Sequence, residues 1–527
     1  MVKKSFERRK CVSSKGVVAA GDLQTANAAA EVLKSGGNAF DAVLAALFAS
    51  TVAEPVLSSL GGGGFLMAKP AEGAAVLYDF FAQTPIVKKS ETDFKPILVD
   101  FGPVTQEFHI GLGSIAMPGV VKGAFDVHKD LATMSMNDIV APARKLAQEG
   151  VQMSALQAHI FEIVKPIYQD CPECSHQYES PATPGALIGA EEILRIPTAA
   201  DFMDALAHEG EDLFYRGEVA QNIARDCEDK GGHLARADFE AYQVLKRKPL
   251  CVNFQGSQIL TNPPPSVGGI LIGFALELLS DTGLKKMGCG SFAYLQRLAN
   301  VMHLTNQARV ESGLNLHPEN GTETLLDPNF LDRYRKDVLG QPKSHRGTTH
   351  ISVIDAKGNA ASMTLSNGEG SAYIAPNTGM VLNNMLGEED INPAGLGNWI
   401  EDTRLSSMMA PSLIERPDGL LVALGSGGSN RIRTAILQVV LGLLEFDQAL
   451  EAAIIQPRIH YENGVLNVEP GFLEGVNARL KETFQATKCW DQQSLFFGGV
   501  HGVEFNVRTK HFAGVGDPRR GGVTISV

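Results

Sequence analysis

The chain has 527 residues, with 46 Lys and Arg against 59 Asp and Glu, so its formal net charge is −13. This acidic balance argues against a nucleic-acid-binding protein, because that role needs a concentrated positive patch that displaces counterions from phosphates. With 44% hydrophobic and 20% charged residues and a mean hydropathy of −0.02, the composition is typical of a globular protein, neither disordered nor membrane-embedded. The 54 glycines predict many tight turns, as in a loop-rich α/β enzyme.

The N-terminal segment and the cysteines predict a cytoplasmic location. Residues 1–16 are basic, but no apolar core of the kind that a secretory signal requires follows them. The apolar run 39–56 is interrupted by Asp41 and Glu54 and falls short of a transmembrane span. Seven scattered cysteines indicate reduced thiols rather than a disulfide framework. We therefore expect a cytoplasmic protein without a membrane segment.

Two of the cysteines, Cys171 and Cys174, form a Cys-Pro-Glu-Cys motif with His176 just beyond it. Such a motif without a second pair of ligands is weak support for zinc binding or redox chemistry. The favoured interpretation is a surface turn.

The first predicted elements are two helices between Gly21 and Ala53, joined by a turn at residues 36–38. Four glycines at 61–64 then precede the apolar run 65–68, which predicts a buried strand. The glycine cluster lacks the Lys-Ser/Thr of a phosphate-binding loop and does not open a helix, so nucleotide binding is not expected.

Residues 119–330 are mostly helical in pattern, with interruptions at 171–184 and 262–266. The polar stretch 341–347 predicts an exposed linker. After it, Thr349–Val353 and Asn359–Leu365 predict a β-hairpin. Further strands are expected at Met380–Leu382, Gly419–Leu424, Gly502–Val507 and Val523–Val527, with helix at Leu437–Ile455.

Thr348 has the sequence context of an N-terminal nucleophile. A threonine at a chain N-terminus carries its own base, because its α-amino group has a pKa of about 8. A cut between Gly347 and Thr348 would create that N-terminus, and Gly347 permits the strained backbone that attack by the Thr348 hydroxyl requires. Two threonines at the start of a strand are also ordinary for a β-sheet. The spacing alone therefore does not distinguish a nucleophile from an ordinary strand residue.

Ten short motifs occur in order along the chain: Asp22–Ala26, Gly36–Ala42, Ser59–Phe65, Pro118–Val120, Pro263–Gly269, Thr348–His350, Leu382–Asn384, Leu405–Met408, Gly425–Ser429 and Asp517–Arg520. Together they resemble the gamma-glutamyltranspeptidase family, also called gamma-glutamyltransferase or glutathione hydrolase, of N-terminal-nucleophile hydrolases. The departures described below are typical of a divergent subgroup.

The resemblance implies an α/β fold, the αββα sandwich of these hydrolases, built from a large subunit, 1–347, and a small catalytic subunit, 348–527. Both would come from one proenzyme and stay together as a heterodimer, with or without further oligomerisation. Thr348 would cleave the chain and then form an acyl-enzyme with a γ-glutamyl amide such as glutathione. Water resolves that ester in hydrolysis, and an amino acid or dipeptide resolves it in transpeptidation.

The expected partners are therefore small-molecule substrates, with no nucleic acid and no membrane. No metal and no organic cofactor is expected, because the nucleophile, the base and the oxyanion stabiliser all come from the chain.

The resemblance also assigns roles around the nucleophile. The backbone N–H groups of Gly428 and Ser429 would stabilise the oxyanion, Ser standing where the family has a second Gly. Ser366, eighteen residues after Thr348, would support the amine and hydroxyl of the nucleophile. Asn367 would replace a substrate-binding Asn that the family has one residue further along.

Three further residues are assigned to substrate binding. Ser406 and Ser407 match a serine pair that binds the substrate α-carboxylate. Glu388 would bind the α-ammonium through charge pairing in a partly desolvated pocket, although its neighbours Glu389 and Asp390 are alternatives.

Two positions depart from the family pattern. Met385 stands where the family has Glu or Gln, and Ser90, beside Lys88 and Lys89, stands where it has an Arg that clamps the substrate carboxylate. A lysine cannot reproduce the fork geometry of that Arg. Gln106, His109 and Arg431 are candidates to compensate, and Arg431 is the more expected anchor of the glycine loop.

Two alternatives stay open. One is a Thr-nucleophile acylase or small-amide hydrolase with a different acyl donor, which the missing Arg and Met385 favour. The other is a catalytically silent binding or scaffold protein, against which Thr348, Ser366 and the glycine loop stand. His350, two residues along the strand from Thr348, is interpreted as structural rather than as part of a Ser/Thr-His-Asp triad.

We predict that the purified protein gives two bands on a denaturing gel, the smaller of which begins Thr-Thr-His-Ile-Ser, because Thr348 attacks its preceding peptide bond. N-terminal sequencing checks this, and the Thr348→Ala variant should stay one chain. A single 56.4 kDa band, unchanged on long incubation and by Thr348→Ala, would contradict self-cleavage and favour the silent scaffold.

Overall fold

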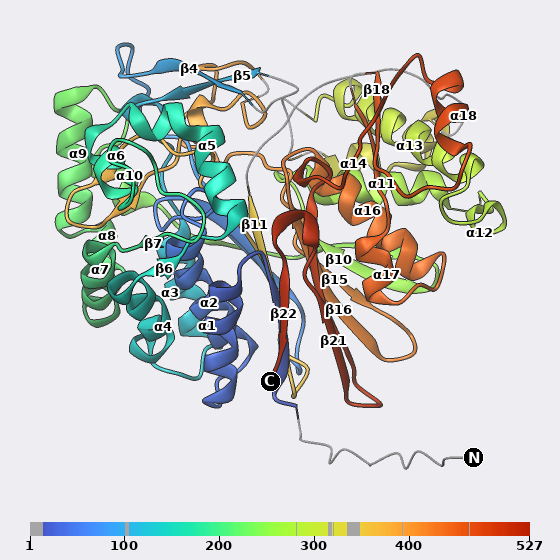
Figure 1. The fold of residues 1–527 in the computed structure, drawn as a ribbon, viewed down its shortest axis with the longest axis horizontal. Helices are drawn as coiled ribbons and strands as arrows, with labels where there is room; N and C mark the ends of the chain where they lie inside the picture. The colour runs from blue at the N-terminus through green and yellow to red at the C-terminus, as the bar shows by residue number, and fades with distance from the viewer. Residues whose placement is uncertain are drawn as a thin grey trace.

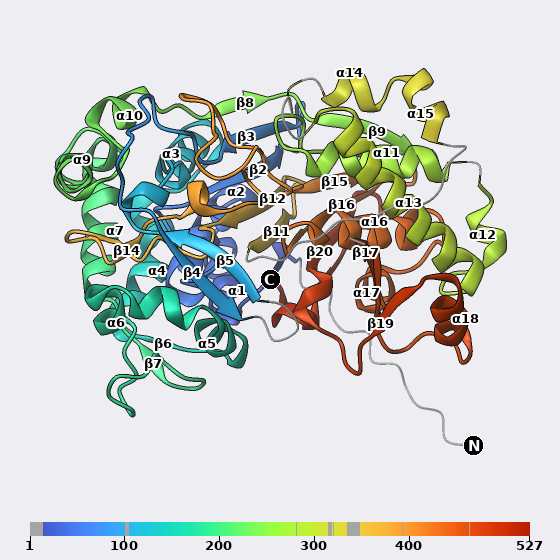
Figure 2. The same cartoon turned by 90° about the horizontal axis from the view of Figure 1, so that it is seen from above.

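Two antiparallel β-sheets stacked face to face form the centre of the molecule, and a layer of helices covers each outer face (Figures 1 and 2). The computed structural model describes residues 14–100, 105–280, 282–314, 319, 321–334, 348–392, 394–462 and 464–527. The predicted linker 341–347 and its bond to Thr348 lie outside the described residues. The four layers confirm the expected αββα sandwich.

The strand orders of the two sheets are as follows. The larger sheet has the order β22 (Val523–Ser526), β1 (Gly16–Ala20), β11 (Thr349–Asp355), β12 (Ala360–Ser366), β2 (Gly63–Lys69), β3 (Val76–Phe80) and β8 (Leu245–Arg247). The smaller sheet has the order β21 (His511–Val515), β20 (Gly499–Asn506), β16 (Leu420–Gly427), β15 (Ser412–Glu415), β10 (Ser257–Thr261) and β9 (Leu250–Phe254). Each sheet therefore combines strands from before and after Thr348.

Helices from the first half of the chain cover the outer face of the larger sheet: α1 (Leu23–Lys34), α2 (Ala39–Ala53), α3 (Val120–Leu131), α4 (Met136–Glu149), α5 (Ala155–Gln169), α6 (Pro172–Gln177), α7 (Pro197–Glu209), α8 (Asp212–Tyr215), α9 (Glu218–Lys230) and α10 (Arg236–Ala241) (Figure 1). The opposite layer holds α11 (Gly268–Leu279), α12 (Leu284–Met287), α13 (Phe292–Glu311), α14 (Gly321–Leu325), α15 (Pro328–Tyr334), α16 (Arg431–Leu444), α17 (Leu450–Ile455) and α18 (Val476–Thr483).

Short sheets complete the fold: β4 (Lys95–Asp100) with β5 (Thr105–Ile110), β6 (Val151–Gln152) with β7 (Ile193–Leu194), β13 (Ile374–Ala375) with β14 (Met380–Val381), and β17 (Ile459–Glu462), β18 (Val465–Val468) and β19 (Ala486–Cys489).

Strand β1 is apolar throughout because both of its faces are buried. Its alternate residues Val18 and Ala20 pack into the core under the first helical layer, whereas Val17 and Ala19 face the other core, which includes the smaller sheet. All four side chains are fully buried. A strand buried on both faces has no polar alternation.

The predicted helices begin at capped positions. Asp22 accepts a hydrogen bond from Gln24 N at 2.7 Å at the start of α1, and Asn38 and Asp41 form a capping box at the start of α2. Such caps satisfy backbone N–H groups that have no partner inside the helix. They confirm the two predicted helices and the turn between them.

The hairpin that follows Thr348 is also confirmed. Strands β11 and β12 pair in antiparallel register, with Ile351 opposite Met363. In the turn, Asp355 Oδ1 accepts hydrogen bonds from Lys357 N and Asn359 N at 2.9 and 3.1 Å, and Gly358 takes the left-handed conformation at φ +91°. This Asx-type turn fixes the register of the central hairpin.

The other expected strands are present as β2, β14, β16, β20 and β22, while the expected helix 437–455 is divided into α16 and α17. Strands β1, β9, β10 and β15 were not predicted. Among the described residues, no helix is long and apolar enough to span a membrane.

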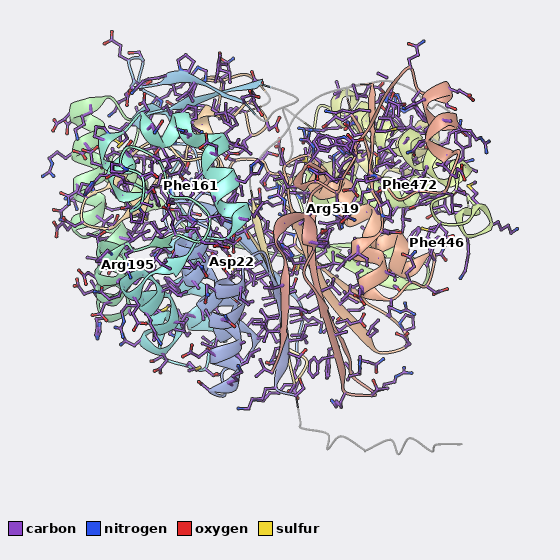
Figure 3. The ribbon with its side chains drawn as sticks, in the orientation of Figure 1. Asp22, Phe161, Arg195, Phe446, Phe472 and Arg519 are labelled. Atoms are coloured by element: carbon purple, nitrogen blue, oxygen red, sulfur yellow. The ribbon has the colours of Figure 1, made fainter. Side chains whose placement is uncertain are left out.

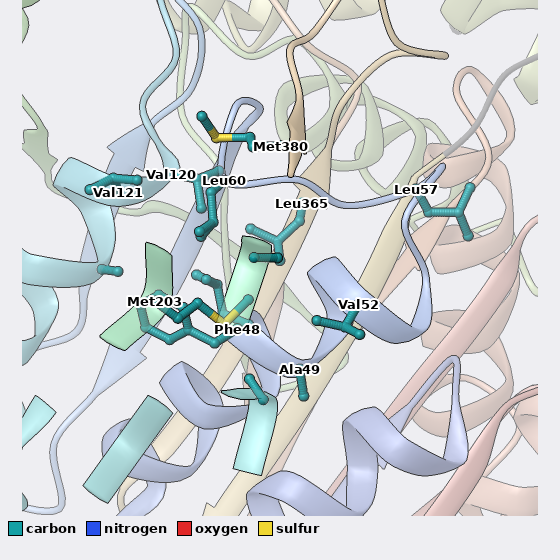
Figure 4. Packing of buried hydrophobic residues seen from close by; sticks show 14 of the residues in the cluster. Phe48, Ala49, Val52, Leu57, Leu60, Val120, Val121, Met203, Leu365 and Met380 are labelled. Atoms are coloured by element: carbon teal, nitrogen blue, oxygen red, sulfur yellow. The ribbon is translucent and has the colours of Figure 1, made fainter. Parts of the chain in front are cut away.

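We predict that Phe48→Ala lowers the free energy of unfolding by about 3–5 kcal/mol, because it leaves a cavity in a tightly packed core. Phe48 lies in α2 and is fully buried among the side chains shown in Figure 4. Denaturant unfolding checks this, with Leu23→Ala as control, since Leu23 is 51% exposed. Equal effects of the two substitutions would contradict the assigned core.

Candidate active site

A small cavity of about 40 Å³ gathers most of the residues that the sequence assigned to catalysis. Of the predicted site residues, it is lined by Thr348, Ser366, Glu388, Ser406, Ser407 and Ser429. Its other lining residues are Phe81, Val267, Asp390, Ile391, Met408, Met409 and Ile432. The cavity therefore takes side chains from both sides of the predicted cleavage point.

Thr348 immediately precedes β11 and is only 4% exposed. Its carbonyl oxygen accepts a hydrogen bond from Arg520 Nη1 at 3.1 Å. Strand β16 passes so close that a methyl group on Gly427 would lie 2.0 Å from the same oxygen. The backbone of Thr348 is thus held by a guanidinium and by a neighbouring position at which only glycine fits.

A buried carboxylate lies behind the nucleophile. Glu54, at the C-terminal end of α2, accepts hydrogen bonds from Thr25 Oγ1 at 2.8 Å and from Thr349 Oγ1 at 2.7 Å. Burial, reinforced by the negative charge of Asp22, raises the pKa of Glu54 to about 7, although both hydroxyl bonds and Arg520 act in the opposite direction. Sequence reasoning missed this residue, which looked only like an interruption of an apolar run.

The glycine loop after β16 contains two successive residues with positive φ. Gly428 has φ +118° and Ser429 has φ +49°, so a serine adopts the left-handed conformation that favours glycine. Its hydroxyl donates to Asp390 Oδ2 at 2.8 Å, which helps to hold the loop. Successive N–H groups in such a turn form an anion-binding concavity.

The serine pair is held by the proline-rich motif 263–269. Ser266 Oγ donates to Ser407 O at 2.8 Å and to Met409 O at 3.0 Å, and Val267 N donates to Ser407 O at 2.8 Å. Both Ser406 and Ser407 line the cavity together with the acidic residues Glu388 and Asp390. Glu388 is 2% exposed, so its charge lies in a partly desolvated site.

Two predicted site residues, Asn367 and Gly428, are not among the described residues that line the cavity. Gly428 directly precedes the lining residue Ser429, whereas Asn367 is held in the core. Asn367 is fully buried, and its amide donates to Val381 O at 3.4 Å. Asp390, named only as an alternative to Glu388, does line the cavity and contacts the glycine loop. The side-chain roles of both stay predictions.

The residues at and beside the sequence position where the family has its arginine are Lys88, Lys89 and Ser90, none of which lines the cavity in the described part of the chain. The ammonium of Lys88 is 4.9 Å from the ring centroid of Trp399, Lys89 N donates to His233 Nδ1 at 3.1 Å, and neither lysine nor Ser90 is among the described residues that line the cavity. The same holds for Gln106 and His109. Among the described residues, neither Lys88 nor Lys89 therefore lines the cavity beside Thr348.

Arg431 is buried at the start of α16, with its guanidinium 4.5 Å from the ring centroid of Phe496. Its backbone N–H donates to Gly428 O at 3.0 Å. These contacts support the interpretation that Arg431 anchors the glycine loop.

Both ring nitrogens of His350 are engaged by side chains of the larger sheet. Its two ring nitrogens bond Thr364 Oγ1 at 2.8 Å and Ser352 Oγ at 2.9 Å, and complete burial keeps its pKa well below the usual value. The structural interpretation of His350 is confirmed.

The Cys-Pro-Glu-Cys motif is not a surface turn, which corrects the sequence interpretation. Cys171 caps α6 and Cys174 is fully buried in the core. Among the residues that the structure describes, no group of three or more His, Cys, Asp or Glu side chains could hold a metal ion.

Comparison with known proteins identifies the family. The sequence model described as Gamma-glutamyltranspeptidase matches residues 25–527. The chain belongs to the gamma-glutamyltranspeptidase family. It is accordingly an enzyme of the N-terminal-nucleophile class, an acyltransferase or amide hydrolase with a threonine nucleophile, and the silent-scaffold alternative is not supported.

The relatives of this chain are named either glutathione hydrolase or acylase. The chain is 27% identical to a glutathione hydrolase proenzyme of Bacillus subtilis (strain 168), and the match covers 99% of this chain and 94% of the relative. It is also 27% identical to the acylase ACY 1 proenzyme of Pseudomonas sp. (strain V22), with 89% and 87% covered. Among solved structures, cephalosporin acylase from Bacillus halodurans matches with a TM-score of 0.83 at 22% identity, covering 99% of this chain and 98% of that one.

We predict that Glu54→Gln makes the thermal stability of the enzyme less sensitive to pH. Because the pKa of Glu54 is about 7 in the folded state and 4.5 ordinarily, the folded state binds more protons between these values, so stability falls as pH rises through this range. The substituted amide has no proton to lose, so the unfolding temperature of the variant relative to the unchanged enzyme should rise from about pH 5 to about pH 7. Unfolding temperatures of the variant and the unchanged enzyme that change with pH in parallel would contradict a contribution from Glu54. The same result with the control Glu451→Gln, on the exposed face of α17, would also contradict it.

Proposed function

We propose that this enzyme cleaves γ-glutamyl amides such as glutathione through an ester on Thr348, and passes the γ-glutamyl group to water or to an amino acid or dipeptide. The observation that carries the proposal is the cavity in which Thr348 meets two carboxylates, a serine pair and the glycine loop. The relatives named glutathione hydrolase support the same activity.

The proposed cycle begins with a cut before Thr348. The new α-amine accepts the proton of the Thr348 hydroxyl, and the oxygen attacks the amide carbonyl of the substrate. The N–H groups of Gly428 and Ser429 stabilise the oxyanion, because fixed donors in a water-poor site need no reorganisation as the charge develops. The amine then protonates the leaving group, and water or an acceptor amine releases the acyl group. Ser366, in the same cavity, supports the amine and hydroxyl of Thr348 in this scheme.

Glu388 gives the cavity its preference for an ammonium group. The γ-glutamyl group carries an α-ammonium and an α-carboxylate, and a buried carboxylate pairs strongly with the former. Ser406 and Ser407 offer hydroxyl donors to the latter, without the bidentate clamp of an arginine. Recognition of the acyl group therefore rests more on its ammonium than on its carboxylate.

A second candidate is an acylase with another acyl donor. The observation that favours it is that Lys88, Lys89 and Ser90 do not line the cavity, which leaves the substrate carboxylate without the family's cation. The acylase relative supports this possibility. In both cases Thr348 would carry the acyl group.

The cytoplasmic location and the subunit boundary at residue 347 stay predictions.

The test compares three p-nitroanilides that differ by one group. The γ-glutamyl compound has both α-substituents, the glutaryl compound lacks the ammonium, and the 4-aminobutyryl compound lacks the carboxylate. We expect kcat/KM to be highest for the γ-glutamyl compound, followed by the 4-aminobutyryl one. A matured enzyme that prefers the glutaryl compound would contradict the proposal and support the acylase.

Site variants connect this preference to Glu388. The Glu388→Gln variant should lose about 10- to 100-fold in kcat/KM toward both ammonium-bearing substrates, as expected for loss of one charged hydrogen bond, with little change toward the glutaryl one. Glu389→Gln is the matched control, because Glu389 is the exposed neighbour. Thr348→Ala should abolish turnover of all three.

A further inference from the structure

A second and much larger cavity, of about 850 Å³, lies among the helices that cover the larger sheet. Its walls include Lys95 on β4, Cys171 and His176 at α6, Asp226 on α9, and Tyr373. No described residue lines both this cavity and the one around Thr348. Arg195, which also lines it, lies well apart from Arg519, the neighbour of Arg520 (Figure 3). The two cavities are separate sites.

Cys171 and Cys174 are arranged as an accessible thiol with a buried thiol behind it. Cys171 is partly exposed on the cavity wall, whereas Cys174 is fully buried. The backbone N–H of Cys174 donates to Cys171 Sγ at 3.4 Å, because Cys171 caps the helix in which Cys174 lies. The cap thus holds the two residues together at the cavity edge.

Cys174 lowers the pKa of the Cys171 thiol through the hydrogen bonds that its side chain and its backbone N–H donate to Cys171. Burial of Cys171 raises that pKa, and so does the Glu173 carboxylate, which accepts a hydrogen bond from Cys171 Sγ at 3.1 Å. The same bond between the side chains, together with burial, raises the pKa of Cys174. The Lys95 ammonium also interacts electrostatically with Cys171. A partly exposed thiol of lowered pKa, backed by a buried and protonated thiol, is the arrangement of attacking and resolving cysteines.

We propose that Cys171 and Cys174 form a redox-active dithiol that exchanges with low-molecular-weight disulfides entering this cavity. The cavity has the size of a small-molecule site. Its walls carry charges of both signs, including the ion pairs of Lys95 with Asp170 at 2.8 Å and of Lys230 with Asp226 at 3.2 Å. Such walls suit a zwitterionic disulfide of the amino-acid type.

The exchange balances in two steps. The Cys171 thiolate attacks one sulfur of the small disulfide, forming a mixed disulfide and releasing one thiolate. Cys174 passes its proton to that thiolate, and its sulfur attacks Cys171 Sγ and expels the second thiolate, which takes a proton from water. The protein loses two electrons and the proton of Cys174, water supplies the second proton, and the small disulfide becomes two thiols.

Cystine is the probe, because it has no amide bond for Thr348 to cleave, so the test is independent of the proposed amidase activity. The full-length reduced enzyme is treated with cystine without oxygen, quenched with acid and alkylated, and its peptides are analysed by mass spectrometry. We expect a Cys171–Cys174 disulfide and two equivalents of cysteine released. In a parallel experiment with limiting iodoacetamide at neutral pH, Cys171 should react about tenfold faster than the exposed Cys251.

Variants separate the two roles. Cys174→Ser should trap the mixed disulfide on Cys171, Cys171→Ser should prevent exchange at this site, and Cys251→Ser should leave the exchange unchanged. A mixed disulfide confined to Cys251 or other thiols, or no reaction of the unchanged enzyme, would overturn the proposal. The result with the unchanged enzyme decides even if a variant fails to fold.

Discussion

The backbone position of Thr348, the proposed nucleophile, depends on a buried guanidinium. Arg520 donates to the carbonyl oxygen of Thr348, and burial lowers its pKa to about 10 while Asp517, Glu369 and Glu54 favour its charge. A buried charge without partners costs several kcal/mol, so this contact requires the whole surrounding set of carboxylates. Asp517 is in turn held by Arg458 at 2.7 Å and by Arg519 at 3.2 Å. The end of the chain thereby fixes the start of β11.

This arrangement explains why the motifs are spread over the whole sequence. The first motif contributes Asp22 and Thr25 behind Thr349, and the last contributes Asp517 and Arg520. Each motif alone forms an ordinary cap or turn. Only the pairing of β1 with β11 on one side and with β22 on the other brings them together.

Much of the site could be predicted from the sequence, because its parts are local. The hairpin has a turn signal at 355–359, the glycine loop has its own motif, and the two first helices have capping residues. Strand β1 could not be found in this way, since a short strand buried on both faces lacks the alternation that marks a half-exposed strand. Strand β9 does alternate between buried and exposed residues, but the exposed Cys251 is itself apolar, so its sequence shows the pattern weakly. Arg520 and Glu54 act across hundreds of residues, so no local pattern reveals their partners. The cysteine motif was misplaced because a Cys-Pro-Glu-Cys pattern does not show that Cys174 is buried in the same core as Phe161 and Tyr178.

The interleaving of strands has a consequence for biosynthesis. A chain that began at Thr348 would lack β1 and β2, the neighbours of β11 and β12, and would expose unpaired strand edges, which favour aggregation. In the proposed precursor both halves would fold while they are tethered, at a high effective concentration, which avoids this. Under that proposal covalent continuity assists folding before the cut, whereas the completed sheets would hold the two pieces together afterwards.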